Sequence, residues 1–378
     1  MTKALFIWSG IVVLVLGTAG FGGWLFSLPP ASAAAEAPLV PQEEAEAMLS
    51  ALRHDGDERP LIAVIGLNDA TETTDYLLPT SILRRADIGE VVMLATDEGA
   101  VQLYPALRVE PDQTIAAFDV EHPFGADYVI VPAMSRDDDP AVLAWLQDQS
   151  RKGARIIGVC AGAKVVGAAG LLDGRRATTH WFYLRDMLRR SPSIDYVADR
   201  RFVADDGVVT TTGITASMPM MLTLIEAIAG RQRADEVAGE IGVESWDMRH
   251  ASGAFGLTRS FATTVLANLA AFWNREVQGI ALEPGMDEAS LALVADAWSR
   301  TYRSRAVTFA QTLSAITTAN GVRVLPDRAE RDWPTNYLVS TFPEQRVADA
   351  LDRTLAAVAT RYGDPTTDVV AMQLEYPR

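Results

Sequence analysis

Short apolar runs alternate with helix-like segments between residues 61 and 230, and this alternation limits the fold class of the chain more than any other feature. The run L-I-A-V-I-G-L at 61–67 is typical of a strand buried on both faces. Similar patterns predict strands at 90–96, 127–132, 154–159 and 207–212, and helices at 75–86, 141–149, 162–169 and 217–228. Strands separated by helices predict a doubly wound α/β fold with a mostly parallel sheet.

The last part of the chain, residues 241–378, has a different pattern. We expect helices at 255–273, 287–302 and 344–361, a strand pair at 306–310 and 322–325, and a final strand at 369–374. This predicts an α+β C-terminal extension that either forms a second small domain or wraps the first.

The same region bears on nucleic-acid binding. A helix-turn-helix would need a second helix beside the one that carries Arg300, Arg303 and Arg305, and the sequence offers none. A net charge of −16 also opposes contact with phosphates. We therefore expect no nucleic-acid partner.

No charge occurs between Lys3 and Glu36, and the uncharged run at 4–28 exceeds the roughly 20 residues that cross a bilayer. We expect residues 1–35 to be a transmembrane anchor, followed by an acidic linker at 36–60 with a short helix at 42–53. A cleavable signal segment that releases a secreted protein is the alternative, although its apolar region usually has only about 7–15 residues. Because Lys3 precedes the run and acids follow it, the folded part is expected outside the cytoplasm, in the periplasm or extracellular space.

The chain has one cysteine, Cys160, in the string G-V-C-A-G between an expected strand and an expected helix. Glycines at this spacing are typical of a nucleophile elbow, in which a tight turn raises the middle side chain above the sheet. The thiol would lie at a helix amino terminus, which favours thiolate. A buried structural cysteine is the alternative, but the strand, the helix and the two glycines favour a functional thiol. A single cysteine and four scattered histidines predict no disulfide, no metal site and no cofactor.

Three strings resemble the ThiJ/PfpI superfamily: G-V-C-A-G (158–162), G-L-L-D-G-R-R-A-T-T-H-W (170–181) and D-G-V-V-T-T-T-G-I-T-A-S (206–217). The resemblance covers roughly residues 61–230, within an expected α/β domain at 61–240. They are most similar to the amidotransferase-like sensor domains of AraC-type regulators and to isocyanide hydratases. The resemblance implies the flavodoxin-like fold of class I glutamine amidotransferases, a small-molecule ligand or substrate, and a homodimer, unless the extension covers the dimer surface.

The resemblance also implies site residues. Asp75, four positions before Pro79, takes the family's acidic position beside the sulfur, where a protonated carboxyl could donate a hydrogen bond or a proton; a helix cap is its structural alternative. His180 takes the family's second-histidine position and could tune the thiol or orient a neighbour, or be a satisfied core residue. Ligand-binding or oxyanion backbone groups are expected at Ala133, Met134, Ala161, Gly162 and Gly213.

The sequence departs from the family's enzymes at three places. Ala161 stands where PfpI-type proteases carry histidine, and G-I-T-A-S lacks the histidine that glutamine amidotransferases need, so neither activity is expected. Pro-Ala-Met at 132–134 replaces a Pro-Gly-Gly loop, which disfavours acyl transfer. The sequence thus predicts a membrane-anchored small-molecule hydratase, hydrolase or thiol redox protein; the alternative is a non-catalytic ligand-sensing domain without DNA binding of its own.

Overall fold

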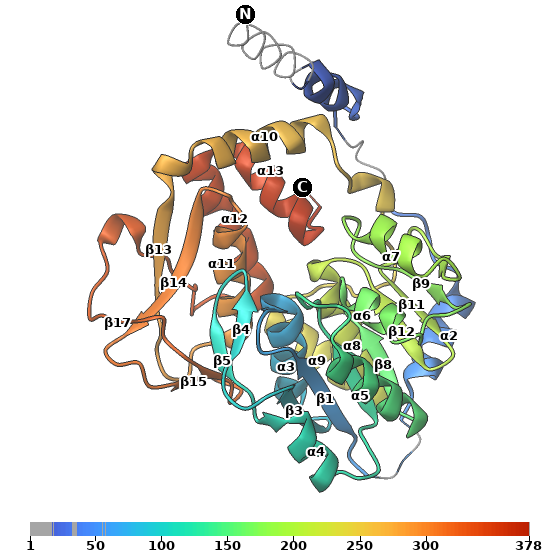
Figure 1. Ribbon diagram of the computed structural model, residues 1–378. Coiled ribbons are helices and arrows are strands. Elements are labelled where there is room, and N and C mark those ends of the chain that lie inside the picture. Colours follow the sequence, from blue (N-terminus) through green and yellow to red (C-terminus); the bar gives the residue numbers. More distant parts are fainter. Residues whose placement is uncertain (1–16, 18, 32–35, 55, 57, 378) are drawn as a thin grey trace, which may run out of the picture.

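A central seven-stranded sheet organises the molecule in the computed structural model, which describes residues 17, 19–31, 36–54, 56 and 58–377 (Figure 1). Its strand order is β11-β12-β8-β7-β1-β3-β6. These strands are β1 (Leu61–Gly66), β3 (Glu90–Ala95), β6 (Gln113–Thr114), β7 (Tyr128–Val131), β8 (Arg155–Gly158), β11 (Phe202–Asp205) and β12 (Val208–Thr211). All neighbours are parallel except β11, which runs antiparallel to β12. The predicted doubly wound sheet is therefore present.

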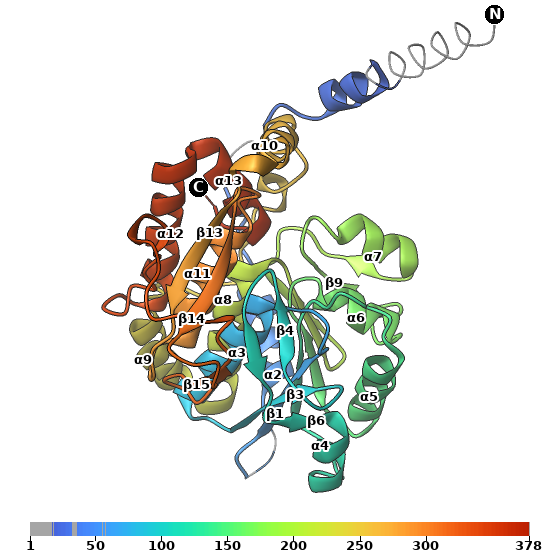
Figure 2. The ribbon, with the colours of Figure 1, turned by 60° about the vertical axis from the view of Figure 1, so that its left-hand side comes forward.

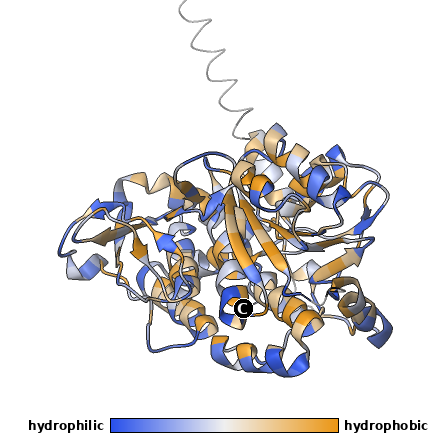
Figure 3. Ribbon diagram, turned by 90° about the horizontal axis from the view of Figure 1, so that it is seen from below, coloured by the Kyte–Doolittle hydropathy of each residue, from blue (hydrophilic) through white to orange (hydrophobic). Residues whose placement is uncertain are grey.

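Helices cover both faces of this sheet (Figure 2). In β1, Ile62 and Val64 contribute to one apolar core while Ala63 and Ile65 contribute to the other, as the two-residue period of a strand requires. One face carries α4 (Ile115–Glu121), α5 (Pro140–Arg151) and α6 (Gly162–Ala168); the other carries α2 (Gln42–Leu52), α3 (Thr73–Ala86), α8 (Ser217–Ala229) and α9 (Arg231–Ile241). Figure 3 shows the apolar strands lying between helices whose outer faces are hydrophilic.

The C-terminal extension packs on the α3 face. Strand β13 (Glu276–Ala281) runs parallel to β14 (Ser304–Ala310), with α11 (Glu288–Ser299) between them in the chain, and β14 also pairs with β17 (Arg328–Ala329). Helix α11 packs against α3 and against α12 (Val347–Tyr362), while α13 (Asp364–Leu374) lies between α12 and α10 (Arg259–Ala270). Buried side chains of these helices belong to the same apolar core as those of α3 and α8. The extension and the α/β part therefore share one apolar core.

Short elements complete the fold. A small sheet in the order β15-β16-β5-β4-β2 joins the extension to the α/β part, and β9 pairs with β10. Their bounds, with that of α7, are β2 (Thr71–Glu72), β4 (Val101–Tyr104), β5 (Arg108–Glu110), β9 (Arg176–Ala177), α7 (Leu184–Arg190), β10 (Asp195–Tyr196), β15 (Ile316–Thr317) and β16 (Arg323–Val324).

Two local predictions for the extension are wrong. The runs at 306–310 and 322–325 do not pair with each other, because β14 pairs with β13 and β17 whereas β16 pairs with β5 and β15. The expected strand at 369–374 is part of helix α13, which begins after Gly363 and has Pro365 in its first turn. Val370 and Leu374, one helical turn apart, both enter the core.

The predicted membrane anchor is also corrected. Within the described ranges, no helix combines the length and the apolar character needed to cross a membrane. Much of the run at 4–28, and most of the expected cleavage site, fall on residues 1–16, 18 and 32–35, which lie outside the described residues. The structure therefore does not support the predicted membrane anchor, nor the periplasmic or extracellular location that was inferred from it.

The expected helix at 42–53 is present as α2, and it docks on the body. The Tyr128 hydroxyl donates a hydrogen bond to the Leu52 carbonyl at 2.7 Å, and Arg200 pairs with Glu44 at 2.9 Å. Met48 and Leu52 enter the main core. This half of the expected linker is thus a packed element.

Candidate functional site

Cys160 lies on a sharp turn between β8 and α6, at the carboxyl end of the sheet. Its φ is +55°, in the left-handed region that is unfavourable for any residue with a side chain. The turn brings α6 so close to β7 that a Cβ on Gly162 would lie 1.9 Å from the Val131 carbonyl oxygen. Only glycine fits there, which explains the second glycine of G-V-C-A-G.

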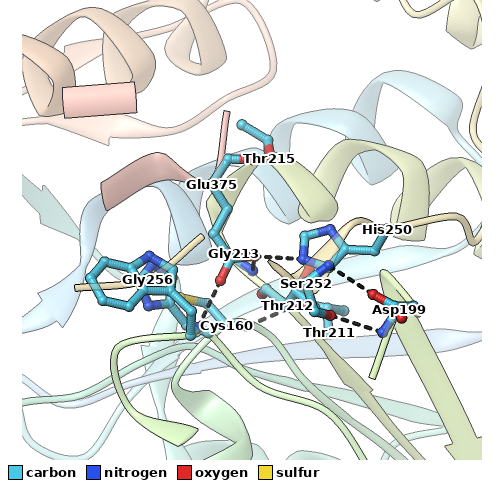
Figure 4. Close-up of polar contacts among 12 residues, drawn as sticks. Cys160, Asp199, Thr211, Thr212, Gly213, Thr215, His250, Ser252, Gly256 and Glu375 are labelled. Atoms are coloured by element: carbon cyan, nitrogen blue, oxygen red, sulfur yellow. Dashed lines mark hydrogen bonds and ion pairs between the residues drawn. The ribbon is translucent and has the colours of Figure 1, made fainter. Parts of the chain in front are cut away.

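Hydrogen bonds fix the backbone of this elbow, while the thiol itself is buried. The N–H of Cys160 donates to Thr211 Oγ1 at 3.0 Å, and Thr179 Oγ1 donates to the Cys160 carbonyl at 3.0 Å (Figure 4). Burial raises the pKa of the Cys160 thiol well above its usual range, and nearby Asp75, Glu72 and Glu375 raise it further. A hydrogen bond from the Ala161 N–H opposes these effects but is outweighed. Burial and the acidic neighbours therefore disfavour the thiolate that a helix amino terminus would favour.

Asp75 reaches the site from the first turn of α3. Its Oδ2 accepts a hydrogen bond from the Ala133 N–H at 3.1 Å, and its Oδ1 has no hydrogen-bond partner among the described residues. Burial and the neighbouring Glu72 raise the pKa of Asp75 well above its usual range, which favours the protonated carboxyl. The helix cap is Glu72, whose Oε2 accepts from the Asp75 N–H at 2.6 Å and from Thr74 Oγ1 at 2.8 Å. The capping alternative for Asp75 therefore does not apply.

The extension brings a guanidinium into this acidic cluster. Arg300 donates to Glu72 Oε1 at 2.6 Å and to Asp296 Oδ2 at 2.7 Å. Burial opposes the charge of Arg300, but Asp296 and Glu72 outweigh it and raise its pKa. Burial, followed by repulsion from Asp296, raises the pKa of Glu72 to about 7, and burial raises that of Asp296. One cation thus faces three buried carboxyl groups (Glu72, Asp75 and Asp296) whose pKa values are all raised, which favours their protonated forms.

This cluster makes a prediction about pH and stability. The pKa of Glu72 is 4.5 in an unfolded chain and about 7 when folded, so its favourable contribution is complete below pH 4.5 and is lost as the pH rises toward 7. We expect the free energy of unfolding to fall by up to about 3 kcal/mol between pH 5 and pH 8. Urea titrations at several pH values measure this. Glu72→Gln should reduce the pH dependence of the free energy of unfolding, whereas Glu98→Gln, at an exposed residue, should not. An unchanged pH dependence in Glu72→Gln would show that other groups cause it.

His180 holds the end of α13. Its Nε2–H donates to the Gln373 carbonyl at 3.0 Å, and its Nδ1 accepts from the Phe182 N–H at 3.2 Å, a pattern that requires the neutral ring. Burial lowers its pKa, although Glu375 opposes this effect. Both ring nitrogens are thus engaged away from the sulfur.

Glu375, at the end of α13, places its carboxyl group beside Cys160. Its Oε1 accepts from the Trp181 N–H and its Oε2 from the Gly213 N–H, each at 2.7 Å (Figure 4). His250 Nε2 lies 3.6 Å from Oε2. We call the two backbone N–H groups of Trp181 and Gly213 the carboxyl cradle. A pocket of about 250 Å³ opens beside it; Glu375, Trp181 and His250 line part of this pocket.

The other predicted backbone groups lie nearby but are engaged. The Ala133 N–H is taken by Asp75, the Gly162 N–H donates to the Val159 carbonyl at 2.7 Å, and Met134 forms a β-bridge with Thr71. Of this predicted set, the structure brings Gly213 into contact with a carboxylate. In the part of the chain that the structure describes, no group of three or more histidine, cysteine or acidic side chains is placed to hold a metal.

The prediction missed four polar residues of the site: Arg300, Asp296, His250 and Glu375. All four belong to the C-terminal extension, and no local motif points to them. Glu72 lies three residues before Asp75 at the start of a helix, which is the spacing of a capping residue.

Comparison with known proteins places this site in a family context. A model described as the DJ-1/PfpI family matches residues 62–227. The HTH-type transcriptional regulator CdhR of Pseudomonas aeruginosa is 38% identical over 184 residues, which are 47% of this chain and 51% of that protein. The isonitrile hydratase of Pseudomonas putida is 40% identical over 100 residues, 26% of this chain and 42% of the other. The chain thus spans about half the length of these relatives or less.

The similarity to solved structures covers about half of this chain. A mutant DJ-1 superfamily protein from Salmonella typhimurium matches 49% of this chain and 100% of its own, with 26% identity and a TM-score of 0.44. The relatives also correct one expectation. Excluding a nucleic-acid partner is wrong, because several similar proteins are HTH-type transcriptional regulators.

Proposed function

Because residues 62–227 form a DJ-1/PfpI family domain, we propose that the chain is a ligand-sensing protein that binds a small molecule at the end of the sheet that carries Cys160. The main support is the state of the thiol, which is buried and surrounded by acidic groups that raise its pKa. Catalysis by a cysteine needs a thiolate or a base that generates one. His180 is occupied elsewhere, so the site is better suited to binding than to turnover.

The C-terminal extension would change its arrangement when the ligand binds. Arg300 and Glu375 both belong to it, and each contacts the α/β part within the site. A ligand that enters must change at least one of these contacts, and it thereby shifts the equilibrium between two arrangements of the extension. The similarity to HTH-type transcriptional regulators, whose names indicate a regulatory role, supports sensing as well.

Hydration of a small molecule is the second candidate. It is favoured by Asp75, a protonated carboxyl whose Oδ1 is without a hydrogen-bond partner in the described part of the chain, and by the similarity to an isonitrile hydratase. Such a carboxyl could donate a proton to a reacting group. It would still need Cys160 as a thiolate.

The reactivity of the thiol separates the two candidates. We expect iodoacetamide to alkylate Cys160 in the folded protein at pH 7 at least about tenfold more slowly than a free thiol, because burial raises its pKa. With a single cysteine in the chain, whole-protein mass spectrometry reports this site alone. The protein unfolded in urea is the control and should react at the normal rate.

Ligand-induced stabilisation completes the test. In a thermal-shift screen of neutral and charged small molecules, Cys160→Ser should retain any rise in Tm that the unaltered protein shows, because sensing needs no nucleophile. Fast alkylation at pH 7 together with loss of the Tm shift in Cys160→Ser would favour the hydratase. No Tm shift with any compound, in the unaltered protein or in any variant, would contradict ligand sensing.

A further inference from the structure

The carboxyl cradle holds an acidic side chain as it would hold a ligand. Both oxygens of Glu375 accept backbone N–H groups, one from Trp181 and one from Gly213, and the side chain is buried. The two donors belong to separate segments, one after β9 and one after β12. Backbone N–H groups directed at one point form an anion site that needs no cationic side chain.

The Glu375 side chain is not what fastens α13. The Trp181 indole donates to the Met372 carbonyl at 2.8 Å, His180 donates to the Gln373 carbonyl, and Leu374 is buried in the core. Glu375 itself has a φ of +52°, in the left-handed region that is unfavourable for a glutamate. The helix end is therefore anchored by other contacts, and the glutamate occupies the cradle in a strained conformation.

Gly213 makes room for this occupant. A Cβ at position 213 would lie 2.6 Å from Glu375 Cβ, so a side chain there would push the glutamate away. Glycine lets a carboxyl group approach the N–H closely, as it does in other anion-binding turns. The cradle is thus open to a carboxylate on the side from which Glu375 enters.

We propose that the carboxyl cradle is the recognition site for a small monocarboxylate, and that Glu375 is an internal occupant which this ligand displaces. This inference rests on the proposed ligand-sensing function and names the class of ligand. The adjoining pocket of about 250 Å³ would take the rest of the molecule. Aromatic and apolar side chains line much of it, among them Trp181, Phe182, Tyr196, Phe255 and Leu257. The ligand would therefore combine one carboxylate with a compact apolar body.

An internal occupant weakens the apparent affinity. A tethered carboxyl group competes at an effective concentration that is typically millimolar for a short flexible tether, and only the fraction of molecules with an empty cradle can bind. Removing the competing side chain should therefore strengthen binding without creating any new contact. This expected gain in affinity is unusual, because removing a side chain from a binding site ordinarily lowers the affinity for the ligand.

Isothermal titration with sodium benzoate and sodium phenylacetate tests the proposal. We expect Glu375→Ala to bind at least one of them about tenfold or more tightly than the unaltered protein does, and not to bind the neutral benzamide. Glu98→Ala, at an exposed acid that does not line the pocket, should behave as the unaltered protein. Equal or weaker carboxylate binding in Glu375→Ala would overturn the proposal.

A matched pair of variants tests the N–H donor itself. Gly213 has a φ of −64°, which proline also adopts. In the Glu375→Ala background, Gly213→Ala and Gly213→Pro both add a Cβ, but only proline removes the N–H. Because the added Cβ also narrows the approach to this N–H, we expect both variants to bind the carboxylate at least about tenfold more weakly than Glu375→Ala alone; unchanged affinity in the proline variant would show that this N–H is not the donor. Circular dichroism confirms that both variants are folded.

The outcome also separates this inference from the function on which it depends. If Glu375→Ala is stabilised by neutral compounds in the thermal-shift screen but binds no carboxylate, the carboxylate assignment is wrong and ligand sensing stands. If neither the unaltered protein nor any variant responds to any compound, both are wrong.

Discussion

Replacing Arg300 by alanine is expected to lower the free energy of unfolding by about 3–5 kcal/mol at pH 7, the usual result of removing one partner from a buried ion pair. Arg300 provides the positive charge that faces Glu72 and Asp296, at 2.6 and 2.7 Å. Without it, these carboxyl groups must remain buried as uncompensated charges or take up protons. Urea denaturation followed by circular dichroism measures the change.

The pH dependence of this loss identifies its cause. Without Arg300, the buried carboxyl groups are most easily tolerated when they are protonated, and protonation becomes less favourable as the pH rises. The destabilisation by Arg300→Ala should therefore be greater at pH 8 than at pH 5. Arg305→Ala, an exposed arginine on β14, is the control and should change the stability by no more than about 0.5 kcal/mol. Combining Arg300→Met with Glu72→Gln and Asp296→Asn should recover much of the loss, because the whole charged cluster is then neutral. A loss of equal size at both pH values would assign the role of Arg300 to packing.

Gly162→Ala is expected to abolish folding or to cost more than about 4 kcal/mol, a value that single substitutions rarely reach. The added Cβ would lie 1.9 Å from the Val131 carbonyl oxygen, which also accepts the Val159 N–H at 2.9 Å. That carbonyl cannot retreat without breaking the hydrogen bond between adjacent segments of the central sheet. Soluble yield and the urea midpoint measure the effect.

The matched control is a glycine in an open helix. Gly239 in α9 has no atom within 4 Å of an added Cβ, so Gly239→Ala should stabilise the protein by about 0.5–1 kcal/mol. If Gly162→Ala proved as stable as the unaltered protein, α6 could not approach β7 as closely as described.

The sequence predicted the α/β sheet well and the extension poorly, for a physical reason. Central strands are buried on both faces, so their apolar runs are unambiguous, and the expected strand at 61–67 differs from β1 by one residue. The run V-V-A-M-Q-L at 369–374 suits a strand or a buried helix equally well by composition. The segment is helical because it packs against α12 and α10, and the local sequence pattern does not reveal these tertiary contacts.

The candidate site divides in the same way. Cys160 belongs to a local motif between a strand and a helix, and the family resemblance implies Asp75 through its spacing to Pro79. Arg300 and Glu375 contact Glu72 and Gly213 across 228 and 162 positions of sequence. A single sequence carries no signal for contacts over such distances, so a site completed by the extension could not be predicted.

The shared apolar core affects how this chain can be divided. Helix α3, which carries Asp75, is packed against α8 on the α/β side and against α11 of the extension. An α/β fragment cut away near residue 240 would leave the α11 side of that helix bare, and its own acidic cluster would lose Arg300. The two parts are therefore not interchangeable modules. A transplant of this sensor into another protein would have to carry α11, α12 and α13 with it.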